Sequence, residues 1–265
     1  MKFNILFYAG LLFFTINTNA QKINHNLYIN DGIDFLSNKE SHYTSNLRSG
    51  IGYNILIGYE RKGGKSINRI SLFFLQTKTG KGNLSGSNIL HSELKYEHLW
   101  KITKKEIYLG AYINIGGLIN LRTGYWTKGT KISYAIWSSL GISTQFQKQL
   151  IIKKLNINWI NKFSFPIVSY LIRPSYAFAY TDNYLYSNVF QRGEKEPANK
   201  IITGGKIVSW DKFLKFRYQT EITMPTNNKK WEFGVNYIFD FIQTREIKPM
   251  IQTSHQINLI TRFTL

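Results

Sequence analysis

The sequence predicts an all-β fold, a transmembrane antiparallel up-and-down β-barrel of about 12 strands, with a range of roughly 10 to 12. Three observations predict it: an export signal, segments that alternate between apolar and polar residues, and short turns that alternate with long loops. A period of two is typical of β-strands, because successive side chains point to opposite faces. Strands that cross a bilayer need about 9–11 such residues.

The first 20 residues have the features of a signal peptide. Met1-Lys2 is a charged start, residues 5–14 form an apolar run, and Thr18 and Ala20 are small residues at the expected cleavage positions. The run is shorter than the roughly 18 apolar residues that a spanning helix requires. We therefore expect cleavage after Ala20 and a single barrel domain over residues 21–265, because no linker or repeat divides the rest.

Composition limits the partners and the chemistry. The chain has no cysteine, which excludes disulfides and thiolate metal sites. Its formal net charge of +19 favours anionic partners. Because an exported protein does not meet nucleic acid, we expect these partners to be anionic lipid head groups and lipopolysaccharide phosphates.

Taken in order, the chain divides into alternating segments and breaks. Residues 21–46 and 243–256 show a weak pattern, and residues 201–210 form a poorer strand with a Gly204-Gly205 break. The clear strands cover 51–60, 69–74, 90–100, 107–116, 132–146, 155–159, 213–222, 231–242 and 257–265. Short turns are expected at 61–65, 103–105, 147–149 and 211–212, and long loops at 79–88, 119–130 and 172–200.

The period alone leaves open which face is inside. A lipocalin-like soluble barrel would bury the apolar positions, whereas a membrane barrel turns them to lipid. The polar positions are rich in Gly, Ser, Asn and Tyr, which suits a crowded polar lumen. The apolar positions often end in aromatic residues, which suits membrane interfaces. Both features favour the membrane barrel.

In these features the chain resembles the outer-membrane β-barrel proteins of Gram-negative bacteria. The resemblance covers residues 21–265 and includes a last strand that ends Phe263-Thr264-Leu265. The usual terminal aromatic residue is displaced, because Phe263 lies two positions before the end on the same face as Leu265. The resemblance implies an outer-membrane location, contact with outer-membrane lipid and lipopolysaccharide, and insertion by the barrel-insertion machinery.

Charged residues at the polar positions form a predicted lumen cluster. Buried charges need partners, so the simplest reading is a salt-bridged ladder that fills a narrow lumen, and a pore lining is the alternative. We expect Lys215 and Arg217 to lie beside Glu232 and Asp240. The full cluster is His91, Glu93, Lys95, Glu97, Lys215, Arg217, Glu221, Glu232 and Asp240.

These features predict a narrow pore or a structural or accessory membrane component, with no cofactor and no metal. A lipid-modifying enzyme of the phospholipase or lipid A deacylase type is the alternative. The sequence supports it weakly, because His91-Ser92 and Ser254-His255 are adjacent pairs whose side chains point to opposite faces. The five histidines also lack the spacing of metal ligands. The loop 172–200 is a possible protein-binding surface through Tyr176, Tyr180, Tyr184 and Tyr186.

Overall fold

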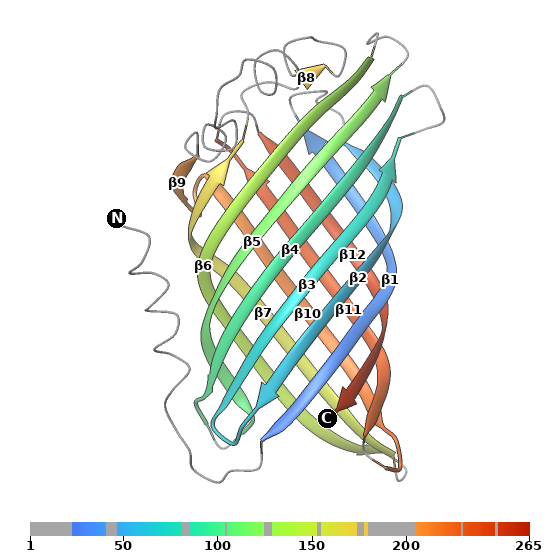
Figure 1. Cartoon of the computed structure of the whole chain (residues 1–265), viewed down its shortest axis with the longest axis vertical. Coiled ribbons are helices and arrows are strands. Elements are labelled where there is room, and N and C mark those ends of the chain that lie inside the picture. The colour runs from blue at the N-terminus through green and yellow to red at the C-terminus, as the bar shows by residue number, and fades with distance from the viewer. Residues whose placement is uncertain are drawn as a thin grey trace.

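The computed structural model of the chain describes residues 23–40, 47–80, 85–103, 105–124, 129–152, 155–173, 178–179, 205–228, 230–246 and 249–265. These residues form one antiparallel sheet that closes into a barrel (Figure 1). Within these ranges no helix is long and apolar enough to cross a membrane. The predicted signal peptide lies outside the described residues.

Ten strands make up the wall of the barrel, and each pairs with its two neighbours. Their order around the barrel is β1-β2-β3-β4-β5-β6-β7-β10-β11-β12, and β12 pairs with β1. Two short strands, β8 (Phe178–Ala179) and β9 (Lys206–Ser209), pair with β6 and β7. The wall strands are β1 (Asn24–Glu40), β2 (Arg48–Lys62), β3 (Ser66–Thr79), β4 (Ser85–Lys101), β5 (Ile107–Gly124), β6 (Gly129–Ile152), β7 (Leu155–Ile172), β10 (Phe213–Pro225), β11 (Trp231–Thr244) and β12 (Met250–Thr264).

The first and last wall strands close the barrel. The β1–β12 ladder runs from the Asn26–Thr264 pair to the Glu40–Met250 pair. Strand β1 therefore begins where β12 ends, and we call this the lower end (bottom of Figure 1). The connections from β2 to β3 and from β4 to β5 lie at the same end, and the opposite end is the upper end. An even number of wall strands brings both ends of the barrel domain to one side, as in bacterial outer-membrane barrels.

The wall has ten strands, at the lower limit of the expected range and two fewer than the favoured number. Of the strand expected over 201–210, the structure describes residues 205–210, which contain β9, and β9 pairs with β7 next to β10. The short turn expected at 211–212 is present, but it interrupts two segments that both pair with β7 and does not connect two neighbouring wall strands. Wall strands are also long, up to 24 residues in β6.

Other boundaries also differ from the sequence prediction. The long loop expected at 119–130 is shorter, because β5 continues to Gly124 and β6 begins at Gly129. The turn expected at 147–149 is displaced, because β6 continues to Ile152, which pairs with Leu155. Polar residues at the rim of a barrel lack an apolar alternation, so strand and turn look alike there. The weak segment 21–46 contains the regular strand β1, whose alternation is broken by an outward Asp31.

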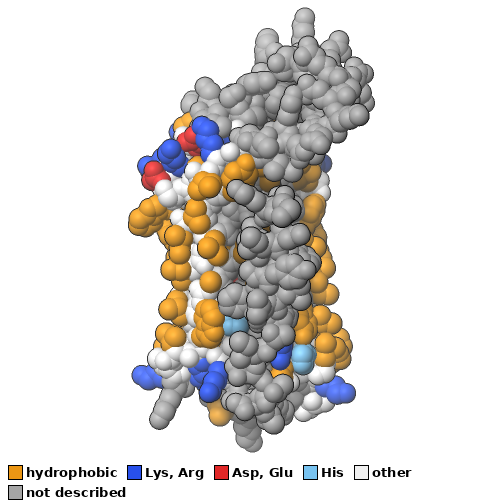
Figure 2. All heavy atoms as spheres, turned by 60° about the vertical axis from the view of Figure 1, so that its left-hand side comes forward, with side chains coloured by type: hydrophobic (Ala, Val, Ile, Leu, Met, Phe, Trp, Pro, Cys, Tyr) orange, Lys and Arg blue, Asp and Glu red, His pale blue; other side chains and the backbone are white. Residues whose placement is uncertain are grey.

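The apolar positions face outward and the polar positions face inward. On β10, Tyr218 and Ile222 are exposed, whereas Arg217 and Glu221 are buried. The same division holds along β1, β3, β11 and β12. Figure 2 shows the resulting apolar wall, with Lys and Arg side chains at its lower end and charges of both signs at its upper end. A soluble lipocalin-like barrel has the reverse arrangement, so that alternative does not fit.

One acidic side chain interrupts the apolar wall. Asp31 is exposed near the middle of β1, and its neighbours across the two ladders are Ile55 and Leu259. No described residue forms a hydrogen bond or an ion pair with its carboxylate. A carboxylate at this position faces the hydrocarbon of a membrane, where a charge is costly.

Candidate functional site

The predicted lumen cluster lies on the inner face of the wall strands. Eight of its nine residues are buried, and the Glu232 side chain is 18% exposed. The cluster does not form one ladder. Its members belong to two separate groups of ion pairs, which we call the lower network and the upper network.

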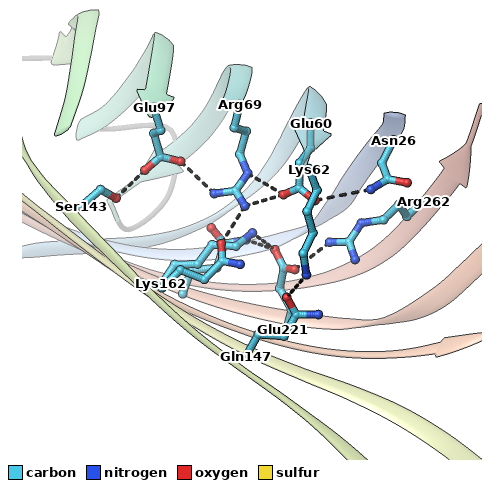
Figure 3. A network of polar contacts seen from close by, with 12 residues as sticks. Asn26, Glu60, Lys62, Arg69, Glu97, Ser143, Gln147, Lys162, Glu221 and Arg262 are labelled. Atoms are coloured by element: carbon cyan, nitrogen blue, oxygen red, sulfur yellow. Dashed lines mark hydrogen bonds and ion pairs between the residues drawn. The ribbon is translucent and has the colours of Figure 1, made fainter. Parts of the chain in front are cut away.

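The lower network lies near the lower end and contains four cationic and four acidic side chains. Arg69 of β3 is its centre (Figure 3). Its guanidinium donates to Glu60 at 2.5 Å and to Glu97 at 2.9 Å. A further bond at 2.8 Å reaches the Gln145 amide oxygen on β6. The members are Glu60, Arg69, Lys95, Glu97, Lys162, Glu221, Glu232 and Arg262.

Glu221 of β10 is the second branching point of the lower network. Its carboxylate accepts hydrogen bonds from Lys162 at 2.5 Å and from Arg262 at 3.0 Å. Arg262 also donates to Glu232 at 2.9 Å. Every carboxylate in this network has a cationic partner, so the network is neutral. Such full pairing is what allows charges to remain in a buried lumen.

The upper network lies farther along the barrel. Arg217 of β10 donates two hydrogen bonds to Asp240 of β11, at 2.7 and 2.6 Å. Glu93 of β4 forms an ion pair with Lys215, and a longer contact of 3.7 Å with Arg217. The His91 Nε2 atom lies 3.9 Å from the Glu93 carboxylate. Two cations thus face two carboxylates, and this network is also neutral when His91 is neutral.

An apolar layer covers the upper network. Trp137 and Phe213 are each 1% exposed, and their ring centroids are 5.7 Å apart. His91 packs against Trp137 at 5.5 Å. The layer also contains Leu36, Leu118, Ile242 and Met250. Above it, Arg173 donates to Glu40 at 2.9 Å. Polar and apolar side chains together fill the lumen at the levels that the structure describes.

The sequence grouped some of these residues correctly by face but not by partner. Arg217 does lie beside Asp240, whereas Glu232 pairs with Arg262 and not with Lys215 or Arg217. Glu60, Arg69, Lys162, Arg262 and Glu40 were not in the predicted cluster. For Glu60, Arg69 and Arg262 a signal existed, because each occupies the polar parity of its strand. The four predicted recognition tyrosines of the 172–200 loop lie outside the described residues.

A pocket of about 830 Å³ lies at the lower mouth of the barrel, and we call it the mouth pocket. Its lining comes from the β2–β3 and β4–β5 connections and from the lower part of β6. Lys62 reaches across the mouth and donates to the Gln147 amide oxygen at 2.7 Å. The charged lining residues are Lys62, Lys101, Lys105, Lys148 and Glu106.

Glu106 is the one acidic residue of this lining. Its carboxylate pairs with Lys101 and accepts a hydrogen bond from the Tyr108 hydroxyl at 2.6 Å. Lys62 lies 3.5 Å away. Burial alone would raise the pKa of Glu106, but the hydrogen bonds from Lys101 and Tyr108 and the charge of Lys62 lower it to about 2. Glu106 is therefore ionised, and four lysines share a single negative charge.

The described histidines have partners other than serine. His25 and Tyr59 are 2.5 Å apart, His98 and Asn68 are 2.5 Å apart, and His255 and Tyr237 are 2.8 Å apart. No serine hydroxyl of the described residues forms a hydrogen bond with a histidine. In the same part of the chain, no group of three or more His, Asp or Glu side chains is arranged to hold a metal ion.

Known structures share this fold. The outer membrane protease OmpT from Escherichia coli is similar over 95% of this chain and 99% of its own, with 7% identity and a TM-score of 0.53. The translocator domain of the autotransporter NalP from Neisseria meningitidis is similar over 98% of this chain and 94% of its own, with 7% identity and a TM-score of 0.47. The chain matches no protein-family model and no curated protein. The likeness to OmpT shows the fold of an outer-membrane β-barrel, which confirms the resemblance stated from the sequence.

Proposed function

We propose that the chain is an outer-membrane barrel with a closed lumen, and that it serves as a structural or accessory component of that membrane. The observation that carries the proposal is the filling of the lumen by two neutral ion-pair networks and an apolar layer. Arg69, Glu221 and Asp240 are no more than 3% exposed, so water does not reach them. A pore needs a continuous aqueous path, which such side chains obstruct.

The proposed placement follows from topology. Both ends of the barrel domain lie at the lower end, which in bacterial outer-membrane barrels faces the periplasm. The upper end would then face outward, with lipopolysaccharide around it. A contact between the 172–200 loop and a protein partner, and insertion by the barrel-insertion machinery, belong to the same proposal and rest on the sequence.

Planar-bilayer recording of refolded protein tests the closed lumen. We expect no unitary conductance from the wild type, while an open porin in the same bilayer conducts. Folding is checked by heat-modifiable gel mobility. Unitary steps from the wild type that shift in Glu93→Gln would instead establish the narrow pore.

The same preparation, incubated with phospholipid or lipid A, should release no fatty acid, and release would favour the enzyme alternative. The likeness to the protease OmpT concerns the fold, so it does not support protease activity for this chain.

A further inference from the structure

The mouth pocket differs from the lumen in its charge. The lower network has equal numbers of cationic and acidic side chains, whereas the mouth pocket has four lysines and one glutamate in its lining. Lys62 and Lys101 share Glu106. Among the described residues, no carboxylate pairs with Lys105 or Lys148. Two ammonium groups therefore face the pocket with no protein counter-charge.

We infer that the mouth pocket binds the phosphate group of an anionic membrane lipid. Lysine ammonium groups bind phosphate as point charges and donate up to three hydrogen bonds each. Lys105 and Lys148 supply the uncompensated charge, and Lys62 spans the mouth between them and the lumen. The pocket volume of about 830 Å³ exceeds the space that a single phosphate ion fills.

The surroundings of the pocket favour a lipid over free phosphate. Phe146 lines the pocket and also packs edge-to-face against Trp159, with ring centroids 5.9 Å apart. Trp159 and Trp100 are 36% and 49% exposed on the outer wall near the lower end. Aromatic residues in this position mark the head-group level of a membrane. A lipid can therefore place its phosphate in the pocket and its acyl chains along the apolar wall.

This inference rests on the proposed membrane placement, and its test is separate from the conductance test. The full chain in a neutral detergent is incubated with phosphatidylglycerol and phosphatidylcholine of the same acyl chains, and bound lipid is measured by native mass spectrometry. We expect retention of phosphatidylglycerol over phosphatidylcholine. The double variant Lys105→Gln/Lys148→Gln should bind phosphatidylglycerol roughly 30-fold more weakly, since each lysine near a membrane surface contributes a factor of about five.

A matched control removes two lysines at the other end. Lys206 and Lys212 both lie near Glu246, with exposed side chains. Lys206→Gln/Lys212→Gln has the same net charge as the test variant and should keep wild-type lipid binding. Equal losses in the two doubles, or equal binding of the two lipids by the wild type, would overturn the inference.

Competition with inorganic phosphate distinguishes binding of a lipid phosphate group from binding of the free phosphate ion. We expect millimolar phosphate to leave the phosphatidylglycerol adduct in place. Complete displacement by phosphate would assign the pocket to the free ion and overturn the lipid assignment. A conducting barrel that still selects phosphatidylglycerol would refute the closed lumen but not the lipid-binding pocket. A barrel that does not conduct and does not select phosphatidylglycerol would refute the lipid-binding pocket but not the closed lumen.

Discussion

The lower network is neutral and the mouth pocket has an excess of positive charge, although both are built on the same strands. On β2, Glu60 belongs to the network and Lys62, two residues later, belongs to the pocket. On β4, Glu97 belongs to the network and Lys101, four residues later, belongs to the pocket. Inside the lower network every charge is paired, whereas at the rim three positive charges remain in excess. A buried charge without a partner is very costly, and a charge at the rim is screened by water and ions.

The largest expected effect comes from breaking the neutrality of the lower network. Arg69→Met removes the ion-pair partner of Glu60, whereas Glu97 keeps its ion pair with Lys95. We expect a loss of about 3–5 kcal/mol in the free energy of unfolding, because the Glu60 carboxylate stays buried without an ion pair. Urea unfolding in lipid vesicles, followed by tryptophan fluorescence, measures this.

Two controls sharpen this result. Arg69→Met combined with Glu60→Gln removes the orphaned charge and should recover part of the stability. Lys105→Gln changes one charge at the rim and should shift the free energy of unfolding by no more than about 0.5 kcal/mol. If Lys105→Gln and Arg69→Met had similar effects, the contrast between lumen and rim would be refuted.

A smaller effect is expected at the outer wall, a third environment for charge. Asp31→Leu removes a carboxylate that faces lipid among apolar neighbours. We expect a gain of about 1–2 kcal/mol in the free energy of unfolding, because acidic residues on the lipid face cost less than Arg or Lys but remain unfavourable. The same unfolding assay applies. Asp211→Leu, at an exposed site near the upper end, should give no gain, and no gain from Asp31→Leu would mean that its carboxylate is not in contact with hydrocarbon.

The smallest effect concerns the pH dependence at the mouth pocket. The folded-state pKa of Glu106 is about 2, below the usual value of 4.5. A lowered pKa means that its contribution to stability is complete above pH 4.5 and is lost as the pH falls toward 2. The side chain is 40% exposed, so screening keeps this contribution below about 1 kcal/mol. Between pH 5 and pH 2, Glu106→Gln should therefore lose slightly less stability than the wild type. An identical slope in the two proteins would mean that Glu106 has no stabilising role.

The alternation of residues predicted the barrel and the face of most side chains, because parity depends only on the local chain. It predicted the contact between Arg217 and Asp240 but not the other ion pairs, because these depend on the register between strands. Glu232 lies opposite Arg262, which is 30 positions away along the chain. The apolar layer had a visible signal in Trp137, a large apolar residue at a polar position of β6.

The mouth pocket could not be identified from alternation, because rim residues lie outside the apolar pattern. Lys62, Lys105 and Lys148 all fell in segments predicted as turns. Identifying the pocket requires the barrel topology in addition to the alternation. In an up-and-down barrel those three turns belong to the same end, so their lysines converge.

The ladder between β1 and β12 has a consequence for the order of assembly. It joins the first and the last wall strand, and just beyond it the Leu265 amide donates to the His25 carbonyl at 2.8 Å. Until β12 arrives, β1 and β11 present unpaired edges that can bind other strands. The barrel therefore completes its hydrogen bonding only after β12 has been delivered, and a chain without β12 remains an open sheet.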